Sequence, residues 1–260
     1  MLEVQGLTKR FGGFTAVSGV SFSLVEGEIL GLIGPNGSGK STTFNLIAGL
    51  YAPSAGSVRL NGEEIGGLMP AHVCHKGIAR TFQIPRPFRR LSILDNVALA
   101  AFYGKDQKIS REKAYADAIE ALALVALPTS AQASVDGLGA AGLKKLELAR
   151  ALATQPKILL ADESLGGLDE SEMNQAADML AAIRKERGIT IIWVTHIMGV
   201  LMRVVDRCIV LDHGEIIAAG LPREVATDPK VIEVYLGTDA AEVQAQAQKG
   251  DAAQAAGAAP

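Results

Sequence analysis

The sequence of 260 residues predicts an α/β fold with a mainly parallel sheet, an antiparallel β part before it and a helical insertion. Three observations support this prediction. Short apolar segments alternate with helical segments, as in 157–161, 170–187 and 190–195. A glycine-rich turn, 34–39, lies between one predicted strand and one predicted helix. A long stretch rich in alanine and leucine, 92–153, has only the helical pattern.

The N-terminal part is dominated by short strands. The apolar and β-branched segments are separated by Gly12-Gly13 and Glu26-Gly27, which are typical of turns. The predicted strands are 2–7, 16–24, 28–33 and 57–60, with a turn at 53–56. Between the last two strands we expect a helix over 40–50, because its large apolar residues recur at helical spacing.

The rest of the chain contains the helical insertion and then more strands. Within 92–153 we expect one helix over 112–127, ended by Pro128, and a second over 143–153. Strands are predicted at 157–161 and 190–195, with a helix over 170–187 between them; 208–212 and 215–219 form a hairpin that turns at His213-Gly214. We expect one domain over 1–237 and a disordered tail over 238–260, where ten alanines and four glutamines occur in 23 residues.

Composition excludes several classes of protein. No segment approaches the roughly 18 consecutive apolar residues of a spanning helix. The net charge of −3 and the absence of a large basic block argue against a dedicated nucleic-acid binder. Only two cysteines are present, which do not form a disulfide framework, so we expect a reducing compartment.

The glycine-rich turn has the residues of a site for nucleotide phosphates. It reads Gly34-Pro35-Asn36-Gly37-Ser38-Gly39-Lys40-Ser41-Thr42 and lies between a strand and a helix. Glycines let backbone amides surround a phosphate, and the helix N-terminus adds partial positive charge. Lys40 is expected to reach the β- and γ-phosphates of a nucleotide and Ser41 to bind Mg²⁺.

A second acidic motif fits the same kind of site. The apolar segment 158–161 is followed by Asp162 and Glu163. Asp162, at the carboxyl end of a strand, is placed to hold Mg²⁺ through water, and Glu163 is placed to orient an attacking water. Alone, two acidic residues that end a strand would be weak evidence; beside a phosphate loop they indicate a hydrolytic nucleotide site.

Together these motifs resemble the ATP-binding subunit of ABC transporters, over residues 2–237. The resemblance implies a P-loop NTPase fold of ABC type, ATP and Mg²⁺ as ligands, and four further residues in family roles. Phe11 would stack on adenine, with Phe14 as a competing candidate. Gln83 would contact Mg²⁺ or the attacking water. Asp169 would lie in a loop that crosses a dimer interface, and His196 would contact the γ-phosphate.

The chain departs from the family at the signature motif, which is usually Leu-Ser-Gly-Gly-Gln. Here the matching residues are Leu138-Gly139-Ala140-Ala141-Gly142. The serine hydroxyl is therefore absent at Gly139, and Ala141 adds a methyl group where the family has glycine. The helix N-terminus that follows still offers N–H groups to phosphate.

The resemblance also implies partners. Two ATPase chains of this family face each other, and each ATP lies between one chain's phosphate loop and the other's signature. Because the signature here is altered, we expect a heterodimer with a second ATP-binding subunit, although a homodimer stays open. Residues 80–83, 89–97 and 231–237 are similar to the branched-chain amino acid uptake group of bacterial importers. That group implies transmembrane permease subunits, a periplasmic binding protein and a peripheral location on the cytoplasmic face of the membrane.

Residues 84–91 are expected to receive a short helix of the membrane subunit. Pro85, Pro87 and Phe88 offer a rigid apolar ledge, and three arginines add charge. A solvated basic loop is the alternative. For the whole chain, the alternatives are an ATPase subunit of a lipid or lipopolysaccharide exporter, an ABC ATPase outside transport, and a module that binds ATP without hydrolysing it.

Overall fold

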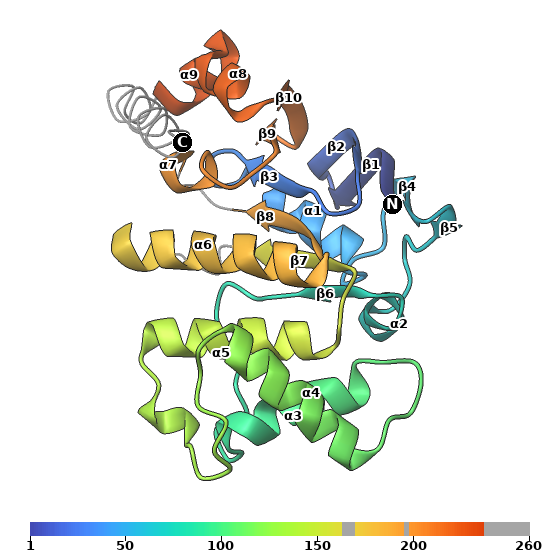
Figure 1. Cartoon of the computed structure of the whole chain (residues 1–260). Coiled ribbons are helices and arrows are strands. Elements are labelled where there is room, and N and C mark those ends of the chain that lie inside the picture. The colour runs from blue at the N-terminus through green and yellow to red at the C-terminus, as the bar shows by residue number, and fades with distance from the viewer. Residues whose placement is uncertain (163–169, 195–197, 237–260) are drawn as a thin grey trace. The chain divides into compact units, whose positions relative to one another are not determined.

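The computed structural model describes residues 1–162, 170–194 and 198–236 (Figure 1). These residues form two compact units. The first unit contains 1–47, 51–67 and the part from residue 192 onwards; the second contains 48–50 and 68–191. Each unit is therefore built from segments that lie far apart in the sequence. The tail expected over 238–260 lies outside the described residues.

The antiparallel β part belongs to the first unit. Its strands are β1 (Leu2–Phe11), β2 (Phe14–Leu24), β4 (Ala55–Leu60) and β5 (Glu63–Glu64), in the order β2-β1-β4-β5. Strand β1 pairs antiparallel with both β2 and β4, which confirms this part of the predicted fold class. In β1 the side chains of Leu2, Val4 and Leu7 are buried, so the spacing of buried residues changes from two to three. The change coincides with a register shift between Val4 and Leu7, where Gly6 has a φ of 56°. This irregularity keeps both apolar sets on the core face.

The first unit also contains the strands that position the glycine-rich loop. They are β3 (Ile29–Ile33), β9 (Arg207–Asp212), β10 (Glu215–Gly220) and the end of β8 (Thr190–Val194), in the order β10-β9-β3-β8. Strands β3 and β9 are parallel, with Gly31 opposite Cys208. Every residue of β3 and β8 is buried, which is typical of a parallel sheet covered on both faces. The hairpin turn lies at His213-Gly214, as predicted, where both residues have positive φ.

Helices α1 (Lys40–Ile47), α7 (Met198–Leu201), α8 (Pro222–Thr227) and α9 (Pro229–Leu236) complete the first unit.

The second unit pairs β6 (Ile78–Arg80) with β7 (Ile158–Asp162) in parallel. Its helices are α2 (Pro70–His75), α3 (Ile93–Tyr103), α4 (Arg111–Leu124), α5 (Ala140–Ala153) and α6 (Glu170–Arg187), with a 3-10 turn at Val135–Gly137. Among the described helices, none combines the length and apolar character needed to cross a bilayer.

Three predicted helix ends are wrong. Helix α1 ends at Ile47 rather than at residue 50. Helix α4 ends at Leu124, and Pro128 does not end it, because Ala126 already has a φ of 53° that an α-helix cannot continue. Helix α5 begins at Ala140 rather than at residue 143, so the last three residues of the altered signature lie in its first turn.

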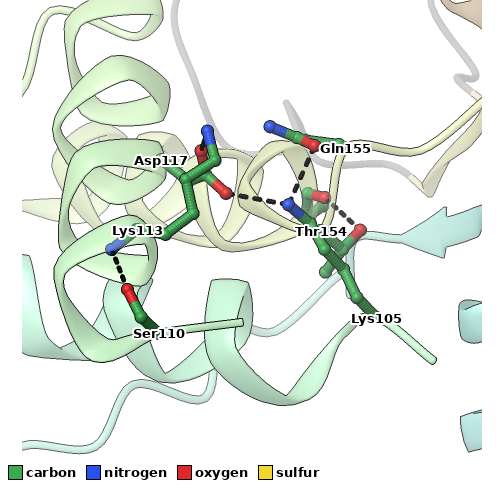
Figure 2. A network of polar contacts seen from close by, with 7 residues as sticks. Lys105, Ser110, Lys113, Asp117, Thr154 and Gln155 are labelled. Atoms are coloured by element: carbon green, nitrogen blue, oxygen red, sulfur yellow. Dashed lines mark hydrogen bonds and ion pairs between the residues drawn. The ribbon is translucent and has the colours of Figure 1, made fainter. Parts of the chain in front are cut away.

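A buried carboxylate joins α4 to the segment after α5 in the second unit (Figure 2). The Asp117 side chain is almost fully buried and accepts from Lys105 Nζ at 2.8 Å and from Lys113 Nζ at 2.6 Å. Lys105 also donates to Gln155 Oε1 at 2.8 Å. Burial pushes the pKa of Asp117 upward, but the two lysines outweigh it and hold that pKa below its usual value. The pairing is therefore what keeps this carboxylate charged in the core.

Candidate functional site

The glycine-rich loop runs from the end of β3 to the start of α1 and requires glycine at two tight positions. A Cβ at Gly34 would lie 2.1 Å from the backbone oxygen of Leu211, and one at Gly39 would lie 2.7 Å from that of Ala16. Both residues have positive φ. By contrast, a Cβ at Gly37 would meet nothing within 4 Å. The loop is thus packed tightly against its own unit at both ends and is open at Gly37.

Lys40 and Ser38 give this loop an anion-binding character. The side chain of Lys40 is buried, and its Nζ donates to the backbone oxygens of Gly34 and Pro35 at 2.8 Å each. The Ser38 hydroxyl is also buried, and it has no hydrogen-bond partner among the described residues. A buried hydroxyl without a partner costs free energy, which a phosphate oxygen can recover. The nucleotide phosphates therefore fit the groups that this loop presents.

The remaining predicted residues of the loop differ in how far they are exposed. Ser41 is exposed and Thr42 half-buried in the first turn of α1, where helix amides have no partner within the helix. Pro35 is half-buried and Asn36 is exposed. The hydroxyl of Ser41 is thus accessible to a metal ion, whereas that of Thr43 donates to Gly39 at 3.0 Å and is committed to the helix.

Phe11 contacts Tyr51 and Lys9, neither of which the sequence analysis predicted as a site residue. Its ring lies edge-to-face with Tyr51, with centroids 5.3 Å apart. Lys9 Nζ lies 5.2 Å from the Phe11 centroid and 5.6 Å from that of Tyr51. Phe11 is 43% exposed, and Phe14, opposite it across the β1–β2 turn, is 67% exposed. An aromatic pair with a nearby cation suits a flat base, and no pattern in the sequence marks Tyr51 as its member.

In the second unit, Asp162 ends β7 as predicted and is buried. Its carboxylate pairs with Arg80 at 2.5 Å, and its amide donates to the Thr81 hydroxyl at 3.2 Å. Gln83 is exposed shortly after β6. Glu163, Asp169 and His196 lie outside the described residues.

The altered signature occupies the N-terminus of α5. Gly139 is the N-cap, with extended backbone (φ −71°, ψ −177°) and no side-chain cap. A Cβ there would meet nothing within 4 Å, whereas one at Gly142 would lie 3.0 Å from the Leu138 side chain. Ala140 is exposed and Ala141 half-buried. These residues therefore present helix N-terminal amides but no hydroxyl.

Residues 84–91 are shaped by a polar framework beneath them. The Asn96 side chain accepts from the Phe88 amide at 2.8 Å and donates to the Phe88 backbone oxygen at 3.0 Å. The Arg150 guanidinium lies 5.2 Å from the Phe88 ring centroid, pairs with Glu147 at 3.0 Å and donates to the Arg86 backbone oxygen at 2.9 Å. Burial raises the pKa of Glu147, and Arg150 opposes that rise. Phe88 is 47% exposed and Ile84 72% exposed, so the loop is an ordered ledge with apolar side chains facing outward.

The C-terminal helix α9 contributes to the phosphate-loop region, which the sequence did not predict. A cavity of about 740 Å³ is lined by 35–38 of the loop, by Asp212 and His213, and by Lys230, Glu233 and Val234. Burial raises the pKa of Tyr235 to about 12, and the Gly34 backbone amide opposes that rise. Helix α9 is therefore a wall of the site and contacts the residue that begins the loop.

Comparison with known proteins identifies the family of the chain. A family profile described as ABC transporter matches residues 17–166, and one described as branched-chain amino acid ATP-binding cassette transporter matches 215–241, which includes α8 and α9. The high-affinity branched-chain amino acid transport ATP-binding protein BraF of Pseudomonas aeruginosa is 36% identical over 91% of this chain and 98% of its own. The corresponding Escherichia coli protein, LivG, is 34% identical over the same shares.

Solved structures agree in fold. A nucleotide-free ATP-binding cassette of an ABC transporter has a TM-score of 0.82 at 29% identity, covering 90% of this chain and 98% of that one. A cassette in its ADP conformation has a TM-score of 0.82 at 31% identity, covering 91% and 98%. A dimeric cassette bound to ADP and phosphate has a TM-score of 0.76 at 29% identity, covering 85% and 99%.

Proposed function

The chain belongs to the ABC transporter family as one of its ATP-hydrolysing subunits, and from that premise we propose that it drives the import of branched-chain amino acids or related amides and carboxylates. The observation that carries the proposal is the phosphate loop, where Lys40 and the unpartnered Ser38 hydroxyl offer the groups that ATP phosphates need. Import rather than lipid export is supported by the similarity to BraF and LivG, which are named as branched-chain amino acid transport proteins, and by the match over 215–241.

The residues divide the work on ATP as follows. When ATP binds, the Lys40 ammonium leaves its hydrogen bonds to the backbone oxygens of Gly34 and Pro35 and contacts the β- and γ-phosphates instead. Phe11 and Tyr51 receive the adenine. Glu163 orients the attacking water with help from His196. Ser41, Asp162 and Gln83 are the groups that would hold Mg²⁺, which neutralises phosphate charge when bound.

ABC ATP-binding subunits act as dimers together with transmembrane permeases, and we infer a heterodimer here. The α5 N-terminus lacks the signature hydroxyl at Gly139, so the site it completes on a partner is weakened. A second, different ATP-binding subunit would leave one site intact. Ile84 and Phe88 on the ledge would receive the permease, and a periplasmic binding protein would deliver the substrate. The chain itself then lies peripherally at the cytoplasmic face of the membrane.

ATP-dependent closure tests the ATPase part of this proposal. Glu163→Gln should retain bound ATP and accumulate a closed dimer, with the second ATP-binding subunit present, detected by light scattering after size-exclusion chromatography. Lys40→Ala in the same background should prevent closure. Rapid ATP turnover by Glu163→Gln would remove Glu163 from its role, and full transport with this chain as the sole ATPase would contradict the heterodimer.

A further inference from the structure

Arg80 forms an ion pair with Asp162, whose carboxylate is one of the groups that would hold the metal ion in the proposed function. Its Nη2 donates to Asp162 Oδ2 at 2.5 Å, and the side chains are 10% and 5% exposed. A buried arginine paired with a buried aspartate satisfies charge on both sides. The structure therefore holds a cation at Asp162 that is part of the chain.

The backbone fixes this pair. Strands β6 and β7 are parallel, with Arg80 opposite Leu160, so Arg80 is carried alongside the end of β7. The next residue, Thr81, donates its amide to the Leu160 backbone oxygen at 3.0 Å and accepts the Asp162 amide at its hydroxyl. These bonds lock the register of the two strand ends, and the ion pair follows from the fold rather than from a chance side-chain encounter.

Arg80 also contacts an aromatic ring. Its guanidinium lies 5.1 Å from the centroid of the Phe82 ring, in the segment that leads to Gln83. Guanidinium groups stack favourably on aromatic faces. Loss of the Asp162 carboxylate would thus leave Arg80 with a remaining contact, which makes exchange of partners feasible within one site.

We propose that Arg80 is a positioning residue that competes with the divalent metal for Asp162, so that metal binding releases the guanidinium toward Phe82. The inference rests on the proposed function, because it takes Asp162 as a metal-facing group. Competition and a purely structural ion pair predict opposite changes in metal affinity when Arg80 is replaced. Removing the Arg80 charge should tighten metal binding, since the competitor is gone, whereas an arginine that merely orders the site would weaken it when removed.

Manganese binding to the ADP-loaded protein measures this competition without relying on turnover. The free Mn²⁺ signal in electron paramagnetic resonance gives the dissociation constant, at about pH 8, where carboxylates are ionised. Arg80→Gln should bind Mn²⁺ about tenfold more tightly than the wild type, because a charged hydrogen bond no longer opposes the metal. Arg80→Lys, which keeps the charge but not the planar fork, should fall between them.

Arg150→Gln is the matched control, because Arg150 also pairs with a buried carboxylate and stacks on an exposed phenylalanine, but does not touch Asp162. It should leave Mn²⁺ affinity unchanged. Equal or weaker Mn²⁺ binding in Arg80→Gln overturns the proposal, and if that variant does not fold, equal or weaker binding in Arg80→Lys does so. Absence of Mn²⁺ binding in the wild type with ADP would instead contradict the proposed function itself.

Discussion

The ammonium of Lys40 donates to the backbone oxygen of Gly34 at 2.8 Å, so the first residue of α1 is tied to the first residue of the phosphate loop. A second bond to Pro35 has the same length. The loop is therefore held in shape by the same side chain that would bind ATP. Removing the side chain should act on both loop structure and nucleotide binding.

Lys40→Ala should abolish measurable ATP binding and also lower the free energy of unfolding by about 1–3 kcal/mol, because buried carbonyls lose a charged donor. Calorimetric titration with ATP and urea denaturation measure the two effects. Lys157→Ala, at an exposed lysine of the second unit, should change neither. ATP affinity retained in Lys40→Ala would show that the loop does not bind phosphate.

Gly139→Ser should partly restore the signature. The N-cap geometry and the open space at Gly139 accept a serine, whose hydroxyl would cap α5 and face a partner's ATP. We expect a stability gain of a few tenths of a kcal/mol, about the ordinary Gly-to-Ser difference at an N-cap. In the assembled ATPase, turnover should rise. Gly137→Ser, also in open space, is the control; equal turnover in both variants would mean that the missing hydroxyl does not limit the site.

Phe88→Asp should separate ATP hydrolysis from transport. Phe88 presents an exposed ring on a ledge held by Asn96 and Arg150, and an aspartate there would place charge in an apolar contact. Nucleotide binding should stay normal while uptake falls at least about tenfold, as for loss of a central apolar anchor. Phe102→Asp, at another exposed phenylalanine of the same unit, controls for the added charge. Undiminished uptake in Phe88→Asp would place the permease elsewhere.

Cys208 should make stability depend on pH in alkaline solution. The thiol lies fully buried on β9, and burial raises its pKa from 9.0 to about 12. The folded chain therefore holds this proton where the unfolded chain has lost it. The stabilisation is complete below pH 9 and is lost as pH rises toward 12, at up to about 1.4 kcal/mol per unit. Tyr235, whose pKa is also about 12, adds to the slope above pH 10.

Urea denaturation at a series of alkaline pH values checks this slope. Cys208→Ala should flatten it between pH 9 and 10, where the ordinary tyrosine value has not yet been reached. An unchanged slope in that window would assign the effect to other groups.

Much of the fold was predictable because its signals are local. The strand before Gly34, the helix from Lys40 and the hairpin at His213-Gly214 follow from periodicity and turn chemistry within a few residues. Helix ends were less predictable. Pro128 marked a helix end in the sequence, but the chain leaves the helix at Ala126, whose backbone conformation no local pattern signals.

The site was predictable as a list of motifs and not as a set of contacts. Asp162 follows from an apolar strand with an acidic end, but its pairing with Arg80 depends on the register of two strands distant in sequence. Tyr51 meets Phe11 only because the chain after α1 returns to β1. Helix α9 is another example, since nothing in residues 229–236 indicates that they border the phosphate loop. Such contacts are set by tertiary packing.

The most direct test of the function is ATP-driven uptake by the assembled transporter. Membrane vesicles containing this chain, a second ATP-binding subunit and the permease subunits should accumulate labelled leucine, isoleucine or valine when ATP and the binding protein are supplied. Lys40→Ala should lower that uptake to the level without ATP. Uptake that persists in Lys40→Ala, or a wild-type assembly that hydrolyses ATP without taking up any of these amino acids or a related amide or carboxylate, would contradict the account.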